Sequence, residues 1–526
     1  MSPTSPRPSI AEKLPGINDS HDLEAQIQGN GGSKFISSPD LSSRPIIDKQ
    51  EKSSILQKFL SYPPSGSLEL KSTSWLDGVR GVAALGVYIF HAMGPWASLV
   101  PAWHADSNQD NIFQLPLIRT IFVSGGAAVA VFFALSGYVL THKSLKWMRS
   151  GQRANIYPAV ASSMFRRGFR LYIPPVVLTF CEMIATRFGI SPPLNFTFVA
   201  ETTLLAQVMD WLSDMNQFIN PFHTFQRSMQ GILIHPKYDA VLWTIPIEFW
   251  GSFVVYTLLL LLARVPSNRL RMFLVAVYAC FSLRLGSWNL FCFSSGMLIA
   301  DFNLSQEETN TVPSPDKPSR FRLIWTTVFA VAFYAAGFPT LVYEEAKRNP
   351  MPGFELLRAI TPTSWNLEDE SRFIWSLSGV ALLVSISQLP IKSLFETNFC
   401  QYLGKISFSL YLIHEFALIL FGLRFQEFLI TITGIAPKSG TLVYWIVCAV
   451  WFWVFTVIVW ALAAQAEKWV DAPSVGFARG LERRCLKFYK SLRWLQKYRS
   501  MNAGFNKIFE ITRAALVSCL DGWLLR

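Results

Sequence analysis

The sequence predicts an all-α, polytopic integral membrane protein with about ten transmembrane helices and both termini in the cytoplasm. Of its 526 residues 51% are hydrophobic and only 16% are charged, whereas about a quarter are charged in a typical soluble protein. Apolar runs long enough to cross about 30 Å of hydrocarbon recur along the chain. Lys and Arg concentrate in the tails and in alternate connections between these runs, and this pattern sets the orientation.

Three regions follow from composition. Residues 1–70 are rich in Ser, Pro, Gly, Asp and Lys and are expected to form a disordered cytoplasmic tail. Residues 71–466 form the membrane domain, and residues 467–526 form a basic amphipathic tail on the cytoplasmic leaflet. The ten predicted spans are 76–95, 118–141, 170–189, 241–263, 271–286, 288–302, 322–341, 373–389, 402–422 and 441–465.

The connections between the spans support this orientation. Residues 142–170 contain seven Lys and Arg and no acidic residue, whereas residues 96–117 contain two Asp and no Lys or Arg. Residues 468–526 hold 12 basic and 4 acidic residues. The glycosylation sequon at Asn195 then falls on the luminal side, as glycosylation requires. The long luminal connection 190–240 contains an expected amphipathic surface helix at 198–211, and it is a candidate lid or acceptor-binding rim together with the loop 342–371.

Arg80 and His91 lie eleven residues apart in the first span. Eleven residues of α-helix advance about 16 Å and return to within about 20° of the same face. One stripe therefore carries a permanent cation near the helix start and a titratable imidazole three turns further in. Ionisable groups inside a membrane usually face a cavity or a partner. The pair predicts an anion clamp followed by a proton acceptor; a structural ion pair of Arg80 with Asp77 and a satisfied interior His91 are the alternatives.

Two further segments supply charged candidates. Arg166 and Arg170 are four residues apart on one helical face, beside Arg167, and suit a grip on phosphate. A role in membrane topology alone is the alternative for these arginines. Glu248 places a carboxylate inside the fourth span, where it needs a cation, a donor or a proton. We expect His91 or an arginine as its partner.

Three uncharged or weakly basic residues complete the set of candidates. Ser136 precedes Gly137 in the second span, where close helix packing is favoured over substrate contact. Trp243 lies in the same segment as Glu248 and is a candidate substrate-binding residue. His414 lies near the luminal end of the ninth span, where a structural hydrogen bond and substrate contact are both open.

Five motifs in these segments resemble the acyltransferase family 3 of integral membrane acyltransferases. They occur in that family's order over roughly 72–465, at 76–85, 133–138, 164–175, 242–248 and 403–414. The resemblance implies a ten-span fold that moves acyl groups from cytoplasmic acyl-CoA to hydroxyls. The family's arginine, ten residues, histidine pattern matches Arg80 and His91, and its basic pair falls within 166–170. The chain departs from the family around Glu248, where one carboxylate and a serine are missing.

The resemblance leads to a specific expectation for the site. Arg80 and the arginines of the third span would hold the phosphates of acyl-CoA at the cytoplasmic mouth. His91 would take the proton of an acceptor hydroxyl, and Glu248 would orient the imidazole or stabilise its charge. No resident cofactor or metal is expected, because the seven Cys are scattered without zinc or disulfide spacing. The acceptor is open among a sugar, a lipid and a secondary metabolite.

Two other classes of function remain. A transporter or flippase without covalent chemistry would also need intramembrane charges, although the sequence shows no inverted repeat. A sensor or scaffold would use the basic tails to bind partners. Nucleic acid is not expected as a partner, because the net charge of +12 lies in tails and loops that flank the spans. The expected location is the endoplasmic reticulum or another endomembrane.

Overall fold

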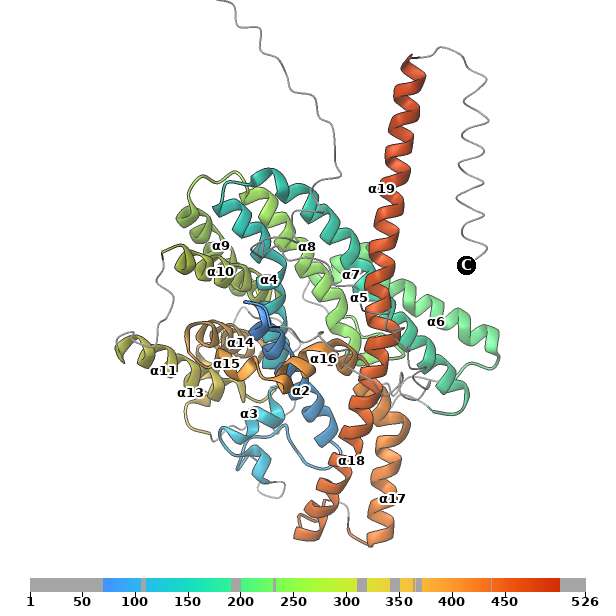
Figure 1. Ribbon diagram of the computed structural model, residues 1–526. Coiled ribbons are helices and arrows are strands. Elements are labelled where there is room, and N and C mark those ends of the chain that lie inside the picture. The colour runs from blue at the N-terminus through green and yellow to red at the C-terminus, as the bar shows by residue number, and fades with distance from the viewer. Residues whose placement is uncertain are drawn as a thin grey trace, which may run out of the picture. The chain divides into compact units, whose positions relative to one another are not determined.

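The computed structural model describes residues 70–105, 110–190, 200–229, 233–309, 319–340, 351–362, 365, 371–436 and 438–501, and every regular element in them is a helix (Figure 1). The all-α prediction is therefore confirmed. The predicted disordered tail up to residue 69, the sequon at Asn195 and residues 502–526 lie outside the described residues.

Each of the ten predicted segments lies largely on one long helix. These helices are α2 (Ser74–Met93), α4 (Gly125–Arg149), α5 (Ile156–Arg187), α8 (Thr244–Leu262), α9 (Asn268–Arg284), α10 (Trp288–Glu308), α11 (Ser319–Ala336), α14 (Ser371–Gln388), α16 (Asn398–Ala417) and α18 (Leu442–Ala466). Among the described residues, five helical runs are long and apolar enough to cross a membrane, namely Gly125–Arg149, Arg153–Arg187, Ala240–Leu262, Asn398–Thr433 and Leu442–Arg493.

Shorter helices fill the connections. They are η1 (Ile112–Gln114), α3 (Ile118–Val123), η2 (Arg153–Asn155), α6 (Leu204–Ile219), α7 (Pro221–Met229), η3 (Ala240–Trp243), α13 (Phe354–Ala359), α15 (Lys392–Phe395) and α17 (Leu423–Thr433). The expected surface helix at 198–211 is α6, and it begins later because the Thr203 side chain accepts the Ala206 N–H at 3.1 Å and caps it.

Two predicted segments differ in their bounds. The second segment is divided at Ser124 into α3 and α4. The third was predicted to begin at residue 170, yet α5 already begins at Ile156 and continues through Pro174 and Pro175. These prolines have no N–H, so the carbonyls four residues earlier, including that of Arg170, lose their helical hydrogen bonds. The tight pair 271–286 and 288–302 was divided correctly, because α9 ends before Gly286, whose φ is 81°.

Close helix contacts at glycines build the centre of the fold. In Figure 1, α2, α4 and α16 lie together in the middle, and α2 packs against both other helices. A Cβ on Gly81 would lie 2.4 Å from the Gly404 nitrogen, so α2 and α16 touch backbone to backbone. A Cβ on Gly137 would lie 1.9 Å from the Phe293 oxygen, so α4 and α10 do the same.

The connections between the predicted spans can be numbered along the chain. In the pairs described next, even-numbered connections contact each other, and odd-numbered connections contact each other. The ends of α4, α9 and α10, which face even-numbered connections, meet at Asp301: its carboxylate binds Arg149 at 2.7 Å and Arg271 at 2.8 Å. On the odd side, the Tyr444 hydroxyl donates to the Trp96 carbonyl at 2.6 Å, and the Trp365 indole donates to the Leu283 carbonyl at 3.0 Å. This pairing is the one expected if each predicted span crosses the structure once.

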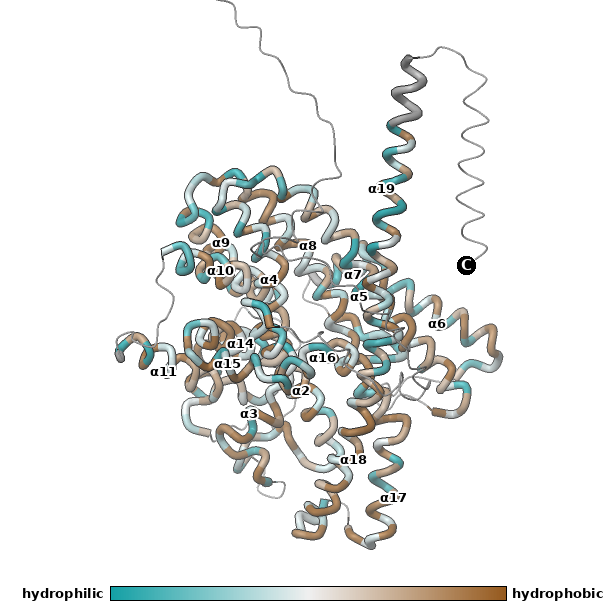
Figure 2. The backbone as a smooth tube through the Cα atoms, viewed as in Figure 1, coloured by the Kyte–Doolittle hydropathy of each residue, from teal (hydrophilic) through white to brown (hydrophobic). Residues whose placement is uncertain are grey.

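The last long helix does not end where the membrane domain was predicted to end. α18 continues through a π-helical turn, η5 (Glu467–Asp471), into α19 (Ala472–Met501). A similar π turn, η4 (Leu418–Gly422), joins α16 to α17. Figure 2 shows mostly hydrophobic residues along α18 and many hydrophilic residues along α19. The basic segment after 466 is therefore helical as far as residue 501 and is continuous with the membrane domain.

Candidate active site

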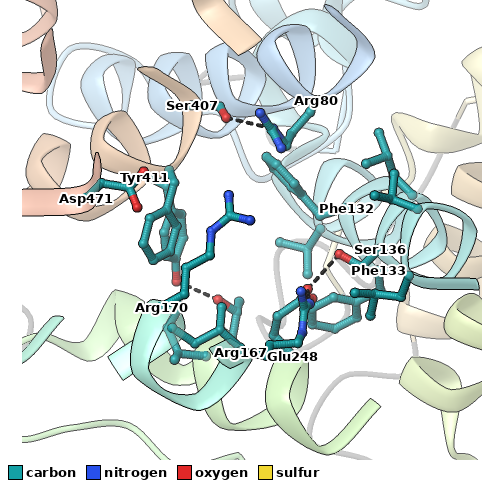
Figure 3. Close-up of a pocket in the computed structure, with 18 of the residues that line it drawn as sticks. Arg80, Phe132, Phe133, Ser136, Arg167, Arg170, Glu248, Ser407, Tyr411 and Asp471 are labelled. Carbon is teal, nitrogen blue, oxygen red and sulfur yellow. Dashed lines mark hydrogen bonds and ion pairs between the residues drawn. The ribbon is translucent and has the colours of Figure 1, made fainter. Parts of the chain in front are cut away.

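A cavity of about 220 Å³ lies between α2, α4, α5, α8 and α16 and is bordered by the end of η5 (Figure 3). Its polar wall is formed by Arg80, Ser136, Arg167, Arg170, Thr244, Glu248, Lys405, Ser407, Tyr411 and Asp471. Its apolar wall includes Val87, Phe132, Phe133 and Leu171. Four basic residues against two acidic ones give the wall an excess of positive charge, which suits an anionic ligand.

Arg80 is held at the wall by α16. Its Nε donates to the Ser407 hydroxyl at 3.0 Å, and its Nη2 donates to the Gly404 carbonyl at 2.7 Å. The predicted ion pair with Asp77 is present at 3.1 Å. Because the backbone contact at Gly404 brings α16 so close, the guanidinium is fixed by three partners while its side chain stays 31% exposed. Arg80 is thus preorganised for an anion in the cavity.

Glu248 pairs with an arginine, which is one of the two partners that the sequence suggested, and not with His91. Its Oε1 accepts a hydrogen bond from the Ser136 hydroxyl at 2.6 Å and pairs with Arg167 Nη2. The expectation that Glu248 orients His91 is therefore wrong in this structure, because α8 directs the carboxylate to α4 and α5. Pro246 lies in the first turn of α8, where its missing N–H costs no helical hydrogen bond.

The arginines of α5 divide between two surroundings. Arg167 and Arg170 line the cavity, and Figure 3 shows the Arg170 guanidinium pointing into it. Arg166 instead faces α19, where its Nε lies 3.4 Å from the Glu482 carboxylate. The predicted grip by Arg166 and Arg170 is thus replaced by Arg167 with Arg170. Arg80 lines the same cavity as these two arginines.

His91 lies one helical turn beyond Val87, which lines the cavity. Its Nδ1 is 3.3 Å from Glu415 Oε2, a contact that sequence analysis missed. The ring of His414 lies 5.0 Å from the His91 ring. The His91 side chain is 26% exposed, whereas His414 is only 2% exposed. Of the two imidazoles, His91 is therefore the one that a ligand can reach.

His414 is buried in a structural position on α16. Its Nδ1 faces the Leu410 carbonyl at 3.1 Å, and its Nε2 has no hydrogen-bond partner among the described residues. The donor atoms of His91, His414 and Glu415 all lie within 4.8 Å of one another, a spacing that a metal ion can bridge. These three residues are the candidate ligands if the protein carries a metal.

Two further carboxylates lie near this group. Glu182 of α5 and Asp239 before η3 are each buried, and each has a carboxylate oxygen without a hydrogen-bond partner among the described residues. Burial raises the pKa of the Asp239 carboxyl to about 7, although the Val241 N–H donates to it. Glu182 and Asp239 thus add two buried carboxylates to the electrostatic surroundings of Glu415.

The remaining predicted residues are placed as follows. Ser136 and Gly137 divide the two roles left open for them: Gly137 packs against α10, and Ser136 lines the cavity. Trp243 lies outside the cavity, where the Arg372 guanidinium stacks 4.7 Å above its ring. Tyr411 was not singled out by the sequence, yet it lines the cavity and its ring lies 6.1 Å from that of His414.

Comparisons with known proteins agree with this geometry. A family model described as an acyltransferase domain matches residues 73–468. The O-acetyltransferase PaAT-1 of Phomopsis amygdali is 30% identical over 442 residues, which is 80% of this chain and 86% of the relative. Acyltransferase R4 of a Phoma species is 25% identical over 70% of this chain and 86% of its own length. Acyltransferase clz18 of Cochliobolus lunatus is 26% identical over 66% and 83%. No solved structure matches the chain.

Proposed function

The chain belongs to the family of this acyltransferase domain and is an acyltransferase, and from that premise we propose that it transfers an acyl group from acyl-CoA to a hydroxyl with His91 as the general base. The observation that carries this proposal is the stripe on α2. Arg80 and Val87 line the cavity, and His91 follows Val87 by one turn on the same helical face. A ligand bound at Arg80 would extend along this helical face toward His91.

The donor would bind by its charged end. Arg80, Arg167 and Arg170 supply guanidiniums for the phosphates of CoA, and Arg166 stands behind them at α19. Glu248 fixes Arg167 in this arrangement and has no direct part in proton transfer. The pantetheine arm would then follow α2 past Val87, over a rise of about 16 Å from Arg80 to His91. This length is the reason for proposing a long, flexible thioester donor.

The reaction needs one proton to move twice. The acceptor hydroxyl gives its proton to His91 as its oxygen attacks the thioester carbon. The carbon–sulfur bond then breaks, and the leaving thiolate of CoA takes the proton back from the imidazolium. Glu415 lies beside His91 Nδ1, so it would orient the ring with the other nitrogen toward the substrates and stabilise the imidazolium. The products are an ester and free CoA.

The membrane arrangement is part of the proposal. The parity of the connections supports ten crossings, and the Lys and Arg of the even-numbered connections support both termini in the cytoplasm. This orientation would place Arg80 on the cytoplasmic side and Asn195 in the lumen of an endomembrane such as the endoplasmic reticulum. Enzymatic removal of N-glycans should then shift the mobility of the protein, and the shift should disappear in Asn195→Gln. A wild-type protein without any glycan shift would contradict the luminal assignment.

The direct test is turnover of acyl-CoA by purified protein in detergent. Acetyl-CoA is the first donor to try, because one relative is named an O-acetyltransferase, followed by longer acyl chains. A crude lipid fraction and a cell extract would serve as acceptors for a sugar, a lipid or a metabolite hydroxyl. Release of free CoA together with an acylated product in the mass spectrum supports the proposal. Product formation from a donor that contains no CoA, with acyl-CoA inert, would refute it.

A further inference from the structure

Asp471 borders the cavity from outside the matched family domain. It is the last residue of η5, the π-helical turn between α18 and α19, whereas the family model ends at residue 468. π turns inside α-helices shift the faces of the residues that follow and are frequent at functional sites. In Figure 3 the Asp471 carboxylate points toward the cavity from the side opposite Glu248.

The carboxylate of Asp471 is nearly buried without a direct ion pair. Its residue is 8% exposed, and its Oδ1 has no hydrogen-bond partner among the described residues. The guanidiniums of Arg170 and Arg80 are its electrostatic neighbours. A buried carboxylate oxygen without a donor is uncommon, because desolvation is costly unless a partner or a nearby positive charge offsets it. Here only the field of the two arginines does so among the residues described.

Three of the other charges in the cavity wall have closer partners. Arg80 pairs with Asp77 at 3.1 Å, and Arg167 pairs with Glu248. Arg170 has no carboxylate within ion-pair distance among the described residues. Both acidic groups of the cavity wall interact electrostatically with it, but Glu248 is already paired with Arg167, whereas Asp471 is not paired in the described part of the chain. Asp471 thus balances a guanidinium that points into the cavity, at a distance that leaves the guanidinium available to a ligand.

We propose that Asp471 is a built-in counter-charge of the donor site, which weakens the binding of CoA phosphates so that the product CoA can leave. This inference rests on the proposed function. With the carboxylate present, the cavity carries one positive charge less, and every phosphate that binds at Arg170 is repelled by Asp471. The residue is therefore a determinant of donor affinity and of preference among donors of different charge.

The position of Asp471 is tied to α19. This helix packs along α5, where Glu482 meets Arg166 at 3.4 Å and the Phe477 ring lies 6.1 Å from that of Phe169. Because these contacts fix α19 against the same helix that carries Arg170, they also fix the separation of Asp471 from Arg170. The segment beyond the family domain is thus a structural part of the donor site.

The test compares CoA binding by titration calorimetry in wild type and Asp471→Asn. Removing one unit charge near a polyanion should lower the Kd for CoA about three- to tenfold at low salt, given effective dielectric constants near 20 to 40. The gain in affinity should be smaller for dephospho-CoA, which carries less negative charge than CoA. It should also become smaller as salt is added. Glu467→Gln is the matched control, since it removes the same charge one turn earlier, outside the cavity wall.

The outcomes separate this inference from the proposed function. Asp471→Ser is a second neutral variant, and both neutral variants should bind CoA more tightly if the inference is correct. The inference would be overturned by an unchanged or higher Kd for CoA in a neutral variant that elutes from a sizing column as the wild type does. An equal gain in CoA affinity in Glu467→Gln would also overturn it. Neither result would refute the proposed donor site. If wild type binds no CoA at all, both the proposed donor site and the proposed role of Asp471 are refuted.

Discussion

The two ends of the stripe on α2 have opposite chemical surroundings. At Arg80 a cavity wall of four basic and two acidic residues surrounds open space, and the guanidinium is fixed by neutral and anionic partners. At His91 the imidazole lies 3.3 Å from the buried Glu415 carboxylate, and its ring lies 5.0 Å from that of His414, whose Nε2 has no hydrogen-bond partner among the described residues. Under the proposed function, permanent charge lies where the donor would be held, and titratable groups lie where a proton would move.

Removal of the His91 imidazole should have the largest effect on turnover. His91→Ala should lower turnover of acyl-CoA by about 10²- to 10⁴-fold, the usual contribution of a positioned general base. CoA affinity should stay within about twofold of wild type, because the phosphates bind three helical turns away. Free CoA released over time gives the rate, and calorimetry gives the affinity. Turnover by His91→Ala near the wild-type rate would contradict the assignment of His91 as the general base.

The next largest effect should come from the carboxylate beside His91. Glu415→Gln keeps the shape of the side chain but removes its charge, so we expect kcat to fall about 10²-fold, a loss typical for the partner that orients a histidine. The Kd for CoA should stay close to that of wild type, because Glu415 does not line the cavity.

Glu427→Gln is the control for that experiment. Glu427 lies on α17, in the same helical run as Glu415, and is exposed, so its loss should leave both kcat and the Kd for CoA unchanged. A kcat close to wild type in Glu415→Gln, or an equal loss of kcat in Glu427→Gln, would contradict the orienting role. Stoichiometric metal in the wild type that is lost in Glu415→Gln would also contradict it and would identify His91, His414 and Glu415 as a metal site instead.

At the other end of the stripe the expected effects are on binding. Arg170→Ala should raise the KM for acyl-CoA about tenfold, because one charge-assisted contact to phosphate is worth about 1 to 2 kcal/mol. Its kcat should change little. Arg166→Ala is matched in charge and in helix but faces Glu482, so its KM should stay close to wild type. Equal effects of the two variants would show that general charge at this surface, rather than the cavity, holds the donor.

The smallest effect should follow from Glu248→Gln. The variant leaves Arg167 without its anionic partner while Ser136 can still donate to the amide oxygen, so we expect a change of a few-fold in KM. The kcat should be unchanged, because the partners of the Glu248 carboxylate are Ser136 and Arg167. A loss of kcat as large as that in Glu415→Gln would assign to Glu248 the role that we propose for Glu415.

Periodicity and composition were sufficient for the helices and for the stripe on α2. Apolar runs located ten helical segments, and the spacing of Arg80 and His91 placed both on one face. Pairing across long separations was beyond the same signals. Glu415 meets His91 from a helix more than 300 residues away in sequence, and no spacing within either segment indicates that contact.

Two errors have local physical causes. Arg166 and Arg170 share a helical face by their spacing of four, but Arg167 is the one that meets Glu248, and α19 covers Arg166. Composition places the tail after 466 in a separate region. It therefore predicts neither the contact of α19 with Arg166 nor the position of Asp471 at the cavity. The π turn that brings Asp471 to the cavity changes the helical register, so a constant 3.6-residue period does not locate it.

The measurement that most directly tests the division of roles along α2 crosses two variants with two readouts. His91→Ala and Arg80→Ala, purified in parallel with wild type, would each be measured for CoA affinity and for the rate of a single turnover at saturating acyl-CoA. We predict that His91→Ala loses the rate and keeps the affinity, whereas Arg80→Ala loses about tenfold in affinity and keeps most of the rate. Equal losses of rate and affinity in both variants would contradict separate binding and proton-transfer ends.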